Sequence, residues 1–121
     1  MKKVLIVEDC PSTTMILTGL LQRQSLDVTA AESGEAAMAL LHDGLVPDLI
    51  FTDLNMDGMT GLELTQQVRA MPALKSVPIL FLTAESKDEI KQQARAYHAQ
   101  GWLVKPFSAD KLVAVVEKFL A

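Results

Sequence analysis

Two hydrophobic periods alternate along the whole sequence, and this alternation constrains the fold more than any other feature. Short, almost continuous apolar runs recur five times, as expected of strands buried on both faces. Between them lie longer stretches whose apolar residues recur about every three to four positions, as on one face of a helix. Regular alternation of strand and helix favours a parallel sheet covered by helices on both sides. The expected fold class is therefore α/β, a doubly wound five-stranded parallel sheet.

The boundaries of these elements follow from apolar runs and helix caps. The expected strands are residues 4–7, 27–31, 48–52, 77–82 and 102–104. Helices are expected over 11–23, from the N-cap Ser33 to about 42, from the capping-box pair Thr60 and Glu63 to near 72, from the similar pair Ser86 and Glu89 to about 100, and after the cap Ser108. No linker or shift of composition divides the chain, so residues 1–121 are expected to form one domain.

Composition excludes several classes of partner. The net charge of −4 argues against nucleic acid or an anionic membrane, because both bind clustered Lys and Arg. Cys10 is the only cysteine, so the chain cannot form an internal disulfide, which suits a reducing compartment. No apolar stretch is long enough for a signal peptide or a membrane span. We therefore expect a cytoplasmic protein with no nucleic-acid and no membrane partner.

Reactive side chains stand at the ends of four expected strands. In a doubly wound sheet the ligand site lies outside the carboxyl ends of the strands. Each group alone has an ordinary explanation, such as a solvated charge or a side-chain turn. Separate surface charges, however, have no reason to gather at four strand ends. The groups are Glu8 and Asp9 after the first strand, Asp53 after the third, Thr83 after the fourth and Lys105 after the fifth.

Three carboxylates at one edge repel one another unless a cation lies among them or a proton is retained. Their hard oxygen ligands suit Mg²⁺, which keeps several waters. His42 and His98 both fall on expected helices, so no zinc site is expected. A magnesium ion beside a carboxylate, a hydroxyl and an ammonium suits phosphoryl transfer, with Asp53 attacking while Lys105 and the metal neutralise the developing charge.

Four motifs carry a resemblance to a known family. KVLIVED, IFTDLNMDGMTG, PILFLTAE and GWLVKPF occur in the order found in the receiver domain of bacterial two-component response regulators. The sequence resembles this family over its whole length, and in particular the single-domain regulators of chemotaxis. The resemblance implies a flavodoxin-like fold with strand order 2-1-3-4-5. It also implies a phosphoacceptor signalling domain that catalyses its own phosphorylation and dephosphorylation, rather than an enzyme with a separate substrate.

The resemblance also implies roles for the residues of the acidic site. Asp53 matches the phosphoacceptor, which is charged by a sensor histidine kinase or phosphotransfer domain, or by a small donor such as acetyl phosphate. Glu8 and Asp9 match the acidic pair that holds Mg²⁺ with Asp53, and the backbone carbonyl of Asn55 matches the remaining protein ligand. Glu8 stands where Asp is more usual, which lengthens the ligand arm.

Other positions match the switch that follows phosphorylation. Thr83 matches the hydroxyl that moves onto the phosphoryl group, and Lys105 matches the ammonium that pairs with it. The bond before Pro106 is cis in the family, although X–Pro bonds are mostly trans. Trp102 falls at the switch aromatic, usually Tyr, Phe or His, and its larger ring needs more space to turn inward. The output protein would bind the surface formed by the fourth helix, fifth strand and fifth helix.

Two further expectations concern single positions. Asn55 and Glu85 match the residues that tune loss of the phosphoryl group, and polar groups there orient water, so we expect a lifetime of seconds to minutes. Cys10 stands where a small hydroxyl residue is frequent, and we expect it to be a buried and inert thiol.

Three classes of function remain open. The first is a chemotaxis-type receiver whose target is the flagellar motor switch. The second is a phosphorelay intermediate or an allosteric receiver. The third is an enzyme on a similar scaffold, although EDCPSTT lacks the glycine of a flavodoxin phosphate loop and Asn55 stands where an aspartate-based phosphatase would have a second acid. The chain is also compatible with a receiver fragment of a larger transcriptional regulator.

Overall fold

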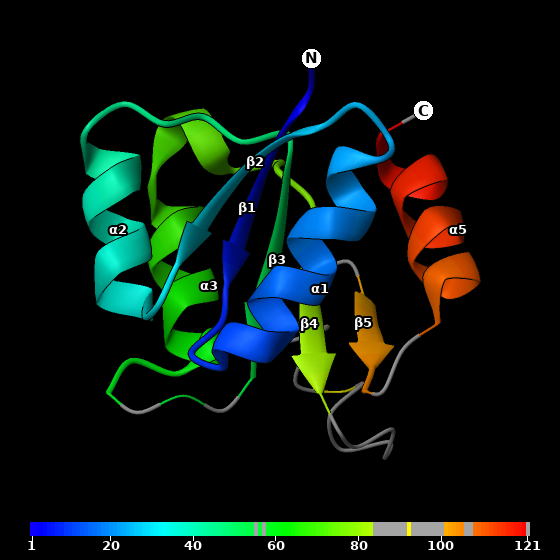
Figure 1. Cartoon of the computed structure of the whole chain (residues 1–121). Coiled ribbons are helices and arrows are strands. Elements are labelled where there is room, and N and C mark those ends of the chain that lie inside the picture. Colours follow the sequence, from blue (N-terminus) through cyan, green and yellow to red (C-terminus); the bar gives the residue numbers. More distant parts are fainter. Residues whose placement is uncertain (55, 57, 84–91, 93–100, 106–107, 121) are drawn as a thin grey trace.

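Five strands and the helices between them form the described part of the chain (Figure 1). The computed structural model describes residues 1–54, 56, 58–83, 92, 101–105 and 108–120. Apart from residue 92, the expected helix over 86–100 lies outside these residues. The strands are β1 (Lys3–Val7), β2 (Asp27–Ala31), β3 (Leu49–Asp53), β4 (Ile79–Thr83) and β5 (Gly101–Val104). The helices are α1 (Pro11–Gln22), α2 (Gly34–His42), α3 (Gly61–Ala70) and α5 (Ala109–Leu120), with a 3₁₀ turn at Pro72–Leu74.

The sheet has the strand order β2-β1-β3-β4-β5, and every neighbouring pair is parallel. This confirms both the fold class and the strand order expected from the sequence. All five arrows in Figure 1 point the same way, so the carboxyl ends of the strands meet at one edge, far from the N-terminus. Parallel pairing of this kind places the ends of sequence-distant strands side by side.

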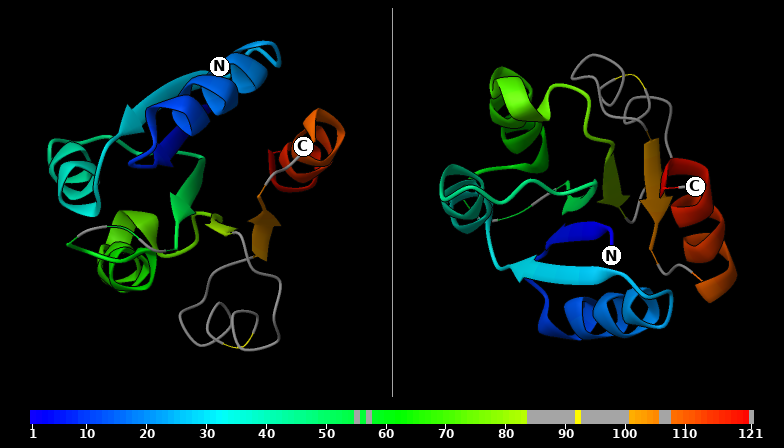
Figure 2. Two further views of the ribbon diagram at one scale, coloured as in Figure 1. Left: turned by 60° about the horizontal axis from the view of Figure 1, so that its bottom comes forward. Right: turned by 90° about the horizontal axis from the view of Figure 1, so that it is seen from above.

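Two apolar layers enclose the sheet. Figure 2 shows α2 and α3 on one face and α1 and α5 on the other. Successive residues of β1 alternate between them: Leu5 and Val7 join the core cluster of α2 and α3, whereas Val4 and Ile6 join that of α1 and α5. Burial on both faces explains why the strands read as continuous apolar runs rather than alternating ones.

The helix starts follow the caps expected from the sequence. The Ser33 hydroxyl accepts the third backbone N–H of α2 at 3.0 Å, and the Ser108 hydroxyl caps α5 in the same way at 3.2 Å. At the start of α3, Thr60 and Glu63 form a reciprocal capping box. These local hydrogen bonds satisfy donors that a helix leaves unpaired at its first turn.

Some boundaries differ from the expected ones by one or two residues. β3 begins after Asp48, whose carboxylate accepts the backbone N–H of Lys3 at 2.7 Å. β3 and β4 each end one residue later than expected, so Asp53 and Thr83 are the last residues of their strands. The paired backbone therefore holds both side chains at the sheet edge.

The apolar residues of α1 cover more of the helix surface than the stripe that packs on the sheet. Leu17 and Leu21 are fully buried, whereas Met15 is 74% exposed and Ile16 is 58% exposed. A helix packed on a sheet buries one stripe of side chains, so apolar residues outside that stripe remain in contact with solvent. None of the described helices has the length and apolar content of a membrane span.

A pair of glycine substitutions tests how tightly the chain packs after Asp53. A Cβ at Gly61 would collide with the carbonyl oxygen of Asp53, whereas a Cβ at Gly19 would meet nothing within 4 Å. We expect Gly61→Ala to lower the free energy of unfolding by about 1 to 3 kcal/mol through overpacking. Gly19→Ala, inside α1, should raise it by about 0.5 to 1 kcal/mol. Urea unfolding measures both, and an unchanged midpoint for Gly61→Ala would contradict the packing described.

Candidate functional site

The backbone ladder continues one residue past three of the strands and so positions the groups at the sheet edge. These hydrogen bonds tie neighbouring strand ends together at the point where side chains with reactive groups project. Because the backbone on either side is paired, the side chains start from fixed positions. The bonds run from the N–H of Glu8 to Ala31 O (3.0 Å), of Leu54 to Leu82 O (3.1 Å) and of Lys105 to Thr83 O (2.7 Å).

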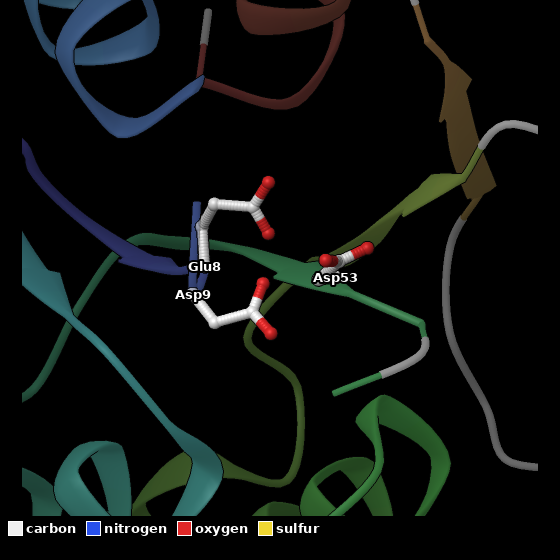
Figure 3. A group of neighbouring side chains, drawn as sticks. All are labelled: Glu8, Asp9 and Asp53. Carbon is white, nitrogen blue, oxygen red and sulfur yellow. The ribbon is translucent and has the colours of Figure 1, made fainter. Parts of the chain in front are cut away.

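Three carboxylates come together at this edge, as the sequence predicted. One oxygen from each of Glu8, Asp9 and Asp53 can be chosen so that all lie within 4.8 Å of one another. Figure 3 shows the three side chains, which come from the ends of β1 and β3 and point toward a common space. Their exposure is graded: the Glu8 side chain is 0% exposed, the Asp53 side chain 14%, and Asp9 is an exposed residue.

Lys105 provides a positive charge within this cluster. Its Nζ lies 2.7 Å from Glu8 Oε1 and 3.4 Å from Asp53 Oδ1, so Glu8 is the closer partner. The longer Glu8 side chain can therefore compete with Asp53 for the ammonium. With all groups ionised, three carboxylates and one ammonium leave an excess negative charge that matches a divalent cation.

The electrostatics of the site depend on the burial of Glu8. The pKa of Glu8 is raised from 4.5 to about 7, chiefly by burial and then by the neighbouring Asp53 carboxylate, while Lys105 opposes the change. Burial alone would lower the pKa of Lys105, but the two carboxylates more than offset this, so its pKa is raised. The ammonium therefore stays charged, and near neutral pH the proton on Glu8 partly relieves the repulsion between the carboxylates.

The residues at this edge fit a magnesium ion. Glu8 Oε2 is buried and accepts no hydrogen bond from the described residues, so it has a lone pair available to a ligand. Such an orphaned buried oxygen is costly unless a proton or cation occupies the site. The donor set is made only of hard oxygens, and Asp9 at the exposed rim leaves room for waters on the metal. Glu8, Asp9 and Asp53 would hold the ion.

Thr83 and Trp102 lie on the two neighbouring strands beyond Asp53. Thr83 is 4% exposed and ends β4, which pairs directly with β3. Trp102 pairs with Phe81 in the β4–β5 ladder and is half-buried against the core cluster of α2 and α3. It also lines a cavity of about 220 Å³ with α5 residues that include Phe119. The structure therefore places Thr83 at the site edge and Trp102 beside the neighbouring core.

Three predicted site residues lie outside the described part of the chain. These are Asn55, Glu85 and Pro106. Their predicted roles, as a metal ligand through the backbone carbonyl, in dephosphorylation and as a cis proline, stay predictions.

The expectation for Cys10 was wrong, because its thiol is exposed rather than buried. Cys10 is the N-cap of α1 and lies past the end of β1, where no layer of the core covers it. Hydrogen bonding to Thr13 lowers the pKa of the thiol.

The groups predicted from the sequence at the strand ends did not include one acid that lies at the sheet edge. Glu32 follows β2 directly and, with Glu8, Asp9 and Met15, lines a cavity of about 570 Å³ beside the acidic cluster. The sequence contained the signal, since Glu32 directly follows β2 just as Glu8 directly follows β1. Glu32 is not one of the three clustered carboxylates.

The fold and the site together define a class of protein. It is a parallel α/β domain that carries clustered carboxylates, a hydroxyl and an ammonium at the ends of its strands. The family model of the response regulator receiver domain matches residues 4–117. The chain belongs to this family of signalling domains. Receiver domains are signalling domains that interact with histidine kinases and downstream effectors.

Similar proteins come from several regulatory systems. The chemotaxis protein CheY of Pseudomonas aeruginosa is 42% identical over 118 residues, which cover 96% of this chain and 94% of that protein. The solved structure of the Vibrio cholerae chemotaxis protein CheY4 matches with a TM-score of 0.94 and 38% identity over 99% of both chains. The phosphate regulon transcriptional regulatory protein PhoB of Rhizobium meliloti is 31% identical over 98% of this chain, but over only 52% of its own length.

The raised pKa of Glu8 predicts that magnesium affinity depends on pH. At pH 6 Glu8 is mostly protonated and at pH 8 mostly ionised, because its pKa is about 7. A cation competes with that proton, so we expect the apparent Mg²⁺ affinity to rise by up to about tenfold per pH unit below 7 and to level off above it. Calorimetric titrations at pH 6, 7 and 8 measure this.

The matched variant for the pH experiment is Glu8→Gln, which keeps the side-chain length but cannot ionise. It should bind Mg²⁺ weakly and with a flatter pH profile. Equal affinity of the unmodified protein at pH 6 and pH 8 would show that Glu8 does not control metal entry.

Proposed function

We propose that this protein is a phosphorylation-activated response regulator of the chemotaxis type, with residues 1–121 as a single receiver domain. Asp53 accepts a phosphoryl group from a sensor histidine kinase in a Mg²⁺-dependent reaction, and the phosphorylated form binds a protein partner. The observation that carries the proposal is the cluster of Glu8, Asp9 and Asp53 with Lys105 within 3.4 Å of Asp53. The family to which the chain belongs supports it.

The chemistry uses the position of Asp53 at the end of β3. A carboxylate oxygen of Asp53 attacks the phosphorus, an O–P bond forms, and the bond from phosphorus to the donor's imidazole nitrogen or acyl oxygen breaks with its electron pair. Bound Mg²⁺ would neutralise charge on the phosphoryl oxygens. Lys105 is held by Glu8 on the side facing Asp53, and its ammonium can shift toward the new charge.

Phosphorylation would then change the balance of contacts at the sheet edge. The phosphoryl group adds roughly 1.5 to 2 negative charges and three acceptor oxygens. Lys105 and the hydroxyl of Thr83 lie on the adjacent strand ends and would satisfy them. Their movement would change the neighbouring loops, and Trp102 on β5 would report it. The active arrangement is thus favoured by contacts that do not exist before phosphorylation.

The chemotaxis assignment rests on the relatives. The matches to chemotaxis proteins of Pseudomonas aeruginosa and Vibrio cholerae extend over nearly the full length of this chain and of each similar protein. The output surface would include β5 and α5 together with residues 86–100, and the target would be the flagellar motor switch. The likeness to PhoB favours a second candidate, a receiver that belongs to a larger transcriptional regulator. A phosphorelay intermediate or an allosteric receiver stays a third.

Trp102, the only tryptophan, provides the first test of the mechanism. Acetyl phosphate with Mg²⁺ should add one phosphoryl group, detected by mass, and change the Trp102 fluorescence. Asp53→Ala should abolish both effects, because it removes the attacking carboxylate. Phosphorylation without a fluorescence change would mean that the site works but that Trp102 is not part of the switch. Unchanged phosphorylation of Asp53→Ala would refute the assignment of the acceptor.

The lifetime and partner of the phosphorylated form separate the candidate functions. After donor removal we expect the phosphoryl group to be lost within seconds to minutes, as suits a brief chemotaxis signal. The phosphorylated protein should bind a flagellar motor-switch peptide more tightly than the unmodified protein does. Transfer of the phosphoryl group to a histidine phosphotransfer domain, with no binding to the peptide, would favour the phosphorelay instead. Survival for hours with Mg²⁺ present would contradict the predicted lifetime.

A further inference from the structure

The first turn of α2 contacts the loop that follows Asp53. This loop connects β3 to α3, and its described residues are 54, 56 and 58–60. Glu35, the second residue of α2, accepts the backbone N–H of Met59 through its Oε1 at 3.2 Å. The two residues are 24 positions apart in the sequence, so this is a tertiary contact between separate strand–helix units. Glu35 is not one of the three clustered carboxylates.

Two glycines shape the chain around this contact. A Cβ at Gly34 would lie 2.8 Å from the Met59 sulfur and 2.9 Å from its Cβ, so the missing side chain makes room for Met59 against α2. Gly58 has a φ of +77°, and a Cβ there would lie 2.7 Å from Glu35 Oε2. The first gives the loop space to approach the helix, and the second lets it turn beside the Glu35 carboxylate.

The same loop is closed at its base next to Asp53. The N–H of Gly61 donates to Leu54 O at 3.0 Å, and the absence of a side chain on Gly61 allows the Asp53 carbonyl to approach. The loop is therefore held at two places. One lies directly beside the proposed phosphoacceptor, and the other is the Glu35–Met59 hydrogen bond on α2.

We propose that Glu35 is a positioning residue for the acidic site: by holding Met59, it fixes the chain that leads into Gly61, which packs against the backbone of Asp53, and so keeps Asp53 in place for Mg²⁺. This inference rests on the proposed function. A carboxylate whose backbone is already held in place loses less conformational entropy when it binds the ion, so the ion binds more tightly. A carboxylate suits this position, because acids are favourable in the first turn of a helix and charged acceptors make the stronger hydrogen bonds.

The test separates the hydrogen bond of Glu35 from its charge. Glu35→Ala removes both, whereas Glu35→Gln keeps an acceptor oxygen at the same reach and removes only the charge. Asp43→Ala is the matched control, since it removes an exposed acid at the opposite end of the same helix. Two measurements are made on each protein: hydrogen exchange of the Met59 amide without metal, and calorimetric titration with Mg²⁺ alone.

We expect Glu35→Ala to speed exchange of the Met59 amide and to weaken Mg²⁺ binding by about threefold to tenfold. This is less than the loss typical of residues that orient metal ligands directly, because the contact is exposed. Glu35→Gln should stay within about twofold of the unmodified protein, since an amide oxygen still accepts the hydrogen bond. Asp43→Ala should change neither measurement.

Other results overturn the proposal. Unchanged exchange of Met59 in Glu35→Ala would show that the contact does not hold the loop. Faster exchange with unchanged Mg²⁺ affinity would show that the anchor does not position the site. If Glu35→Gln weakened Mg²⁺ binding as much as Glu35→Ala does, Glu35 would act through its charge alone and not through its hydrogen bond to Met59. If the unmodified protein binds no Mg²⁺, the proposed function fails with this inference, whereas failure of the variants alone leaves the proposed function intact.

Discussion

Parallel pairing of the strands is the constraint on which the rest of the structure depends. It brings Glu8, Asp53, Thr83 and Lys105 to one edge although the residues span 97 positions from Glu8 to Lys105. The two apolar layers then hold that edge rigid, because the three central strands β1, β3 and β4 are buried on both faces. Like charges are crowded together only because the hydrophobic core gives the strand ends no alternative position.

The crowding has a chemical consequence. Repulsion between the carboxylates is relieved by Lys105, by a proton on Glu8 or by a divalent cation, and these three compete for the same oxygens. The site is therefore sensitive to any change that adds or removes a negative charge at Asp53. Such sensitivity suits a domain that signals by changing its charge, since the same groups bind the metal, assist phosphoryl transfer and respond to the product.

Much of the fold and of the site could be predicted because the signals are local. Alternating apolar runs defined the strands, and the serine and threonine caps marked where α2, α3 and α5 begin. A parallel sheet then required the strand ends to meet, which was enough to group the carboxylates. The exposure of Cys10 and of Met15 could not be read this way, because it depends on where neighbouring segments end and not on residue type.

The sequence by itself determined the order of elements, the residues at the strand ends and the family, since each of these follows from residue types at short spacing. Only the tertiary structure decided which partner each group has. Lys105 lies nearer to Glu8 than to Asp53, and Glu35 reaches Met59 from another strand–helix unit. Differences of less than an ångström between such partners depend on how two separately folded segments pack, and no local pattern of residues encodes that distance.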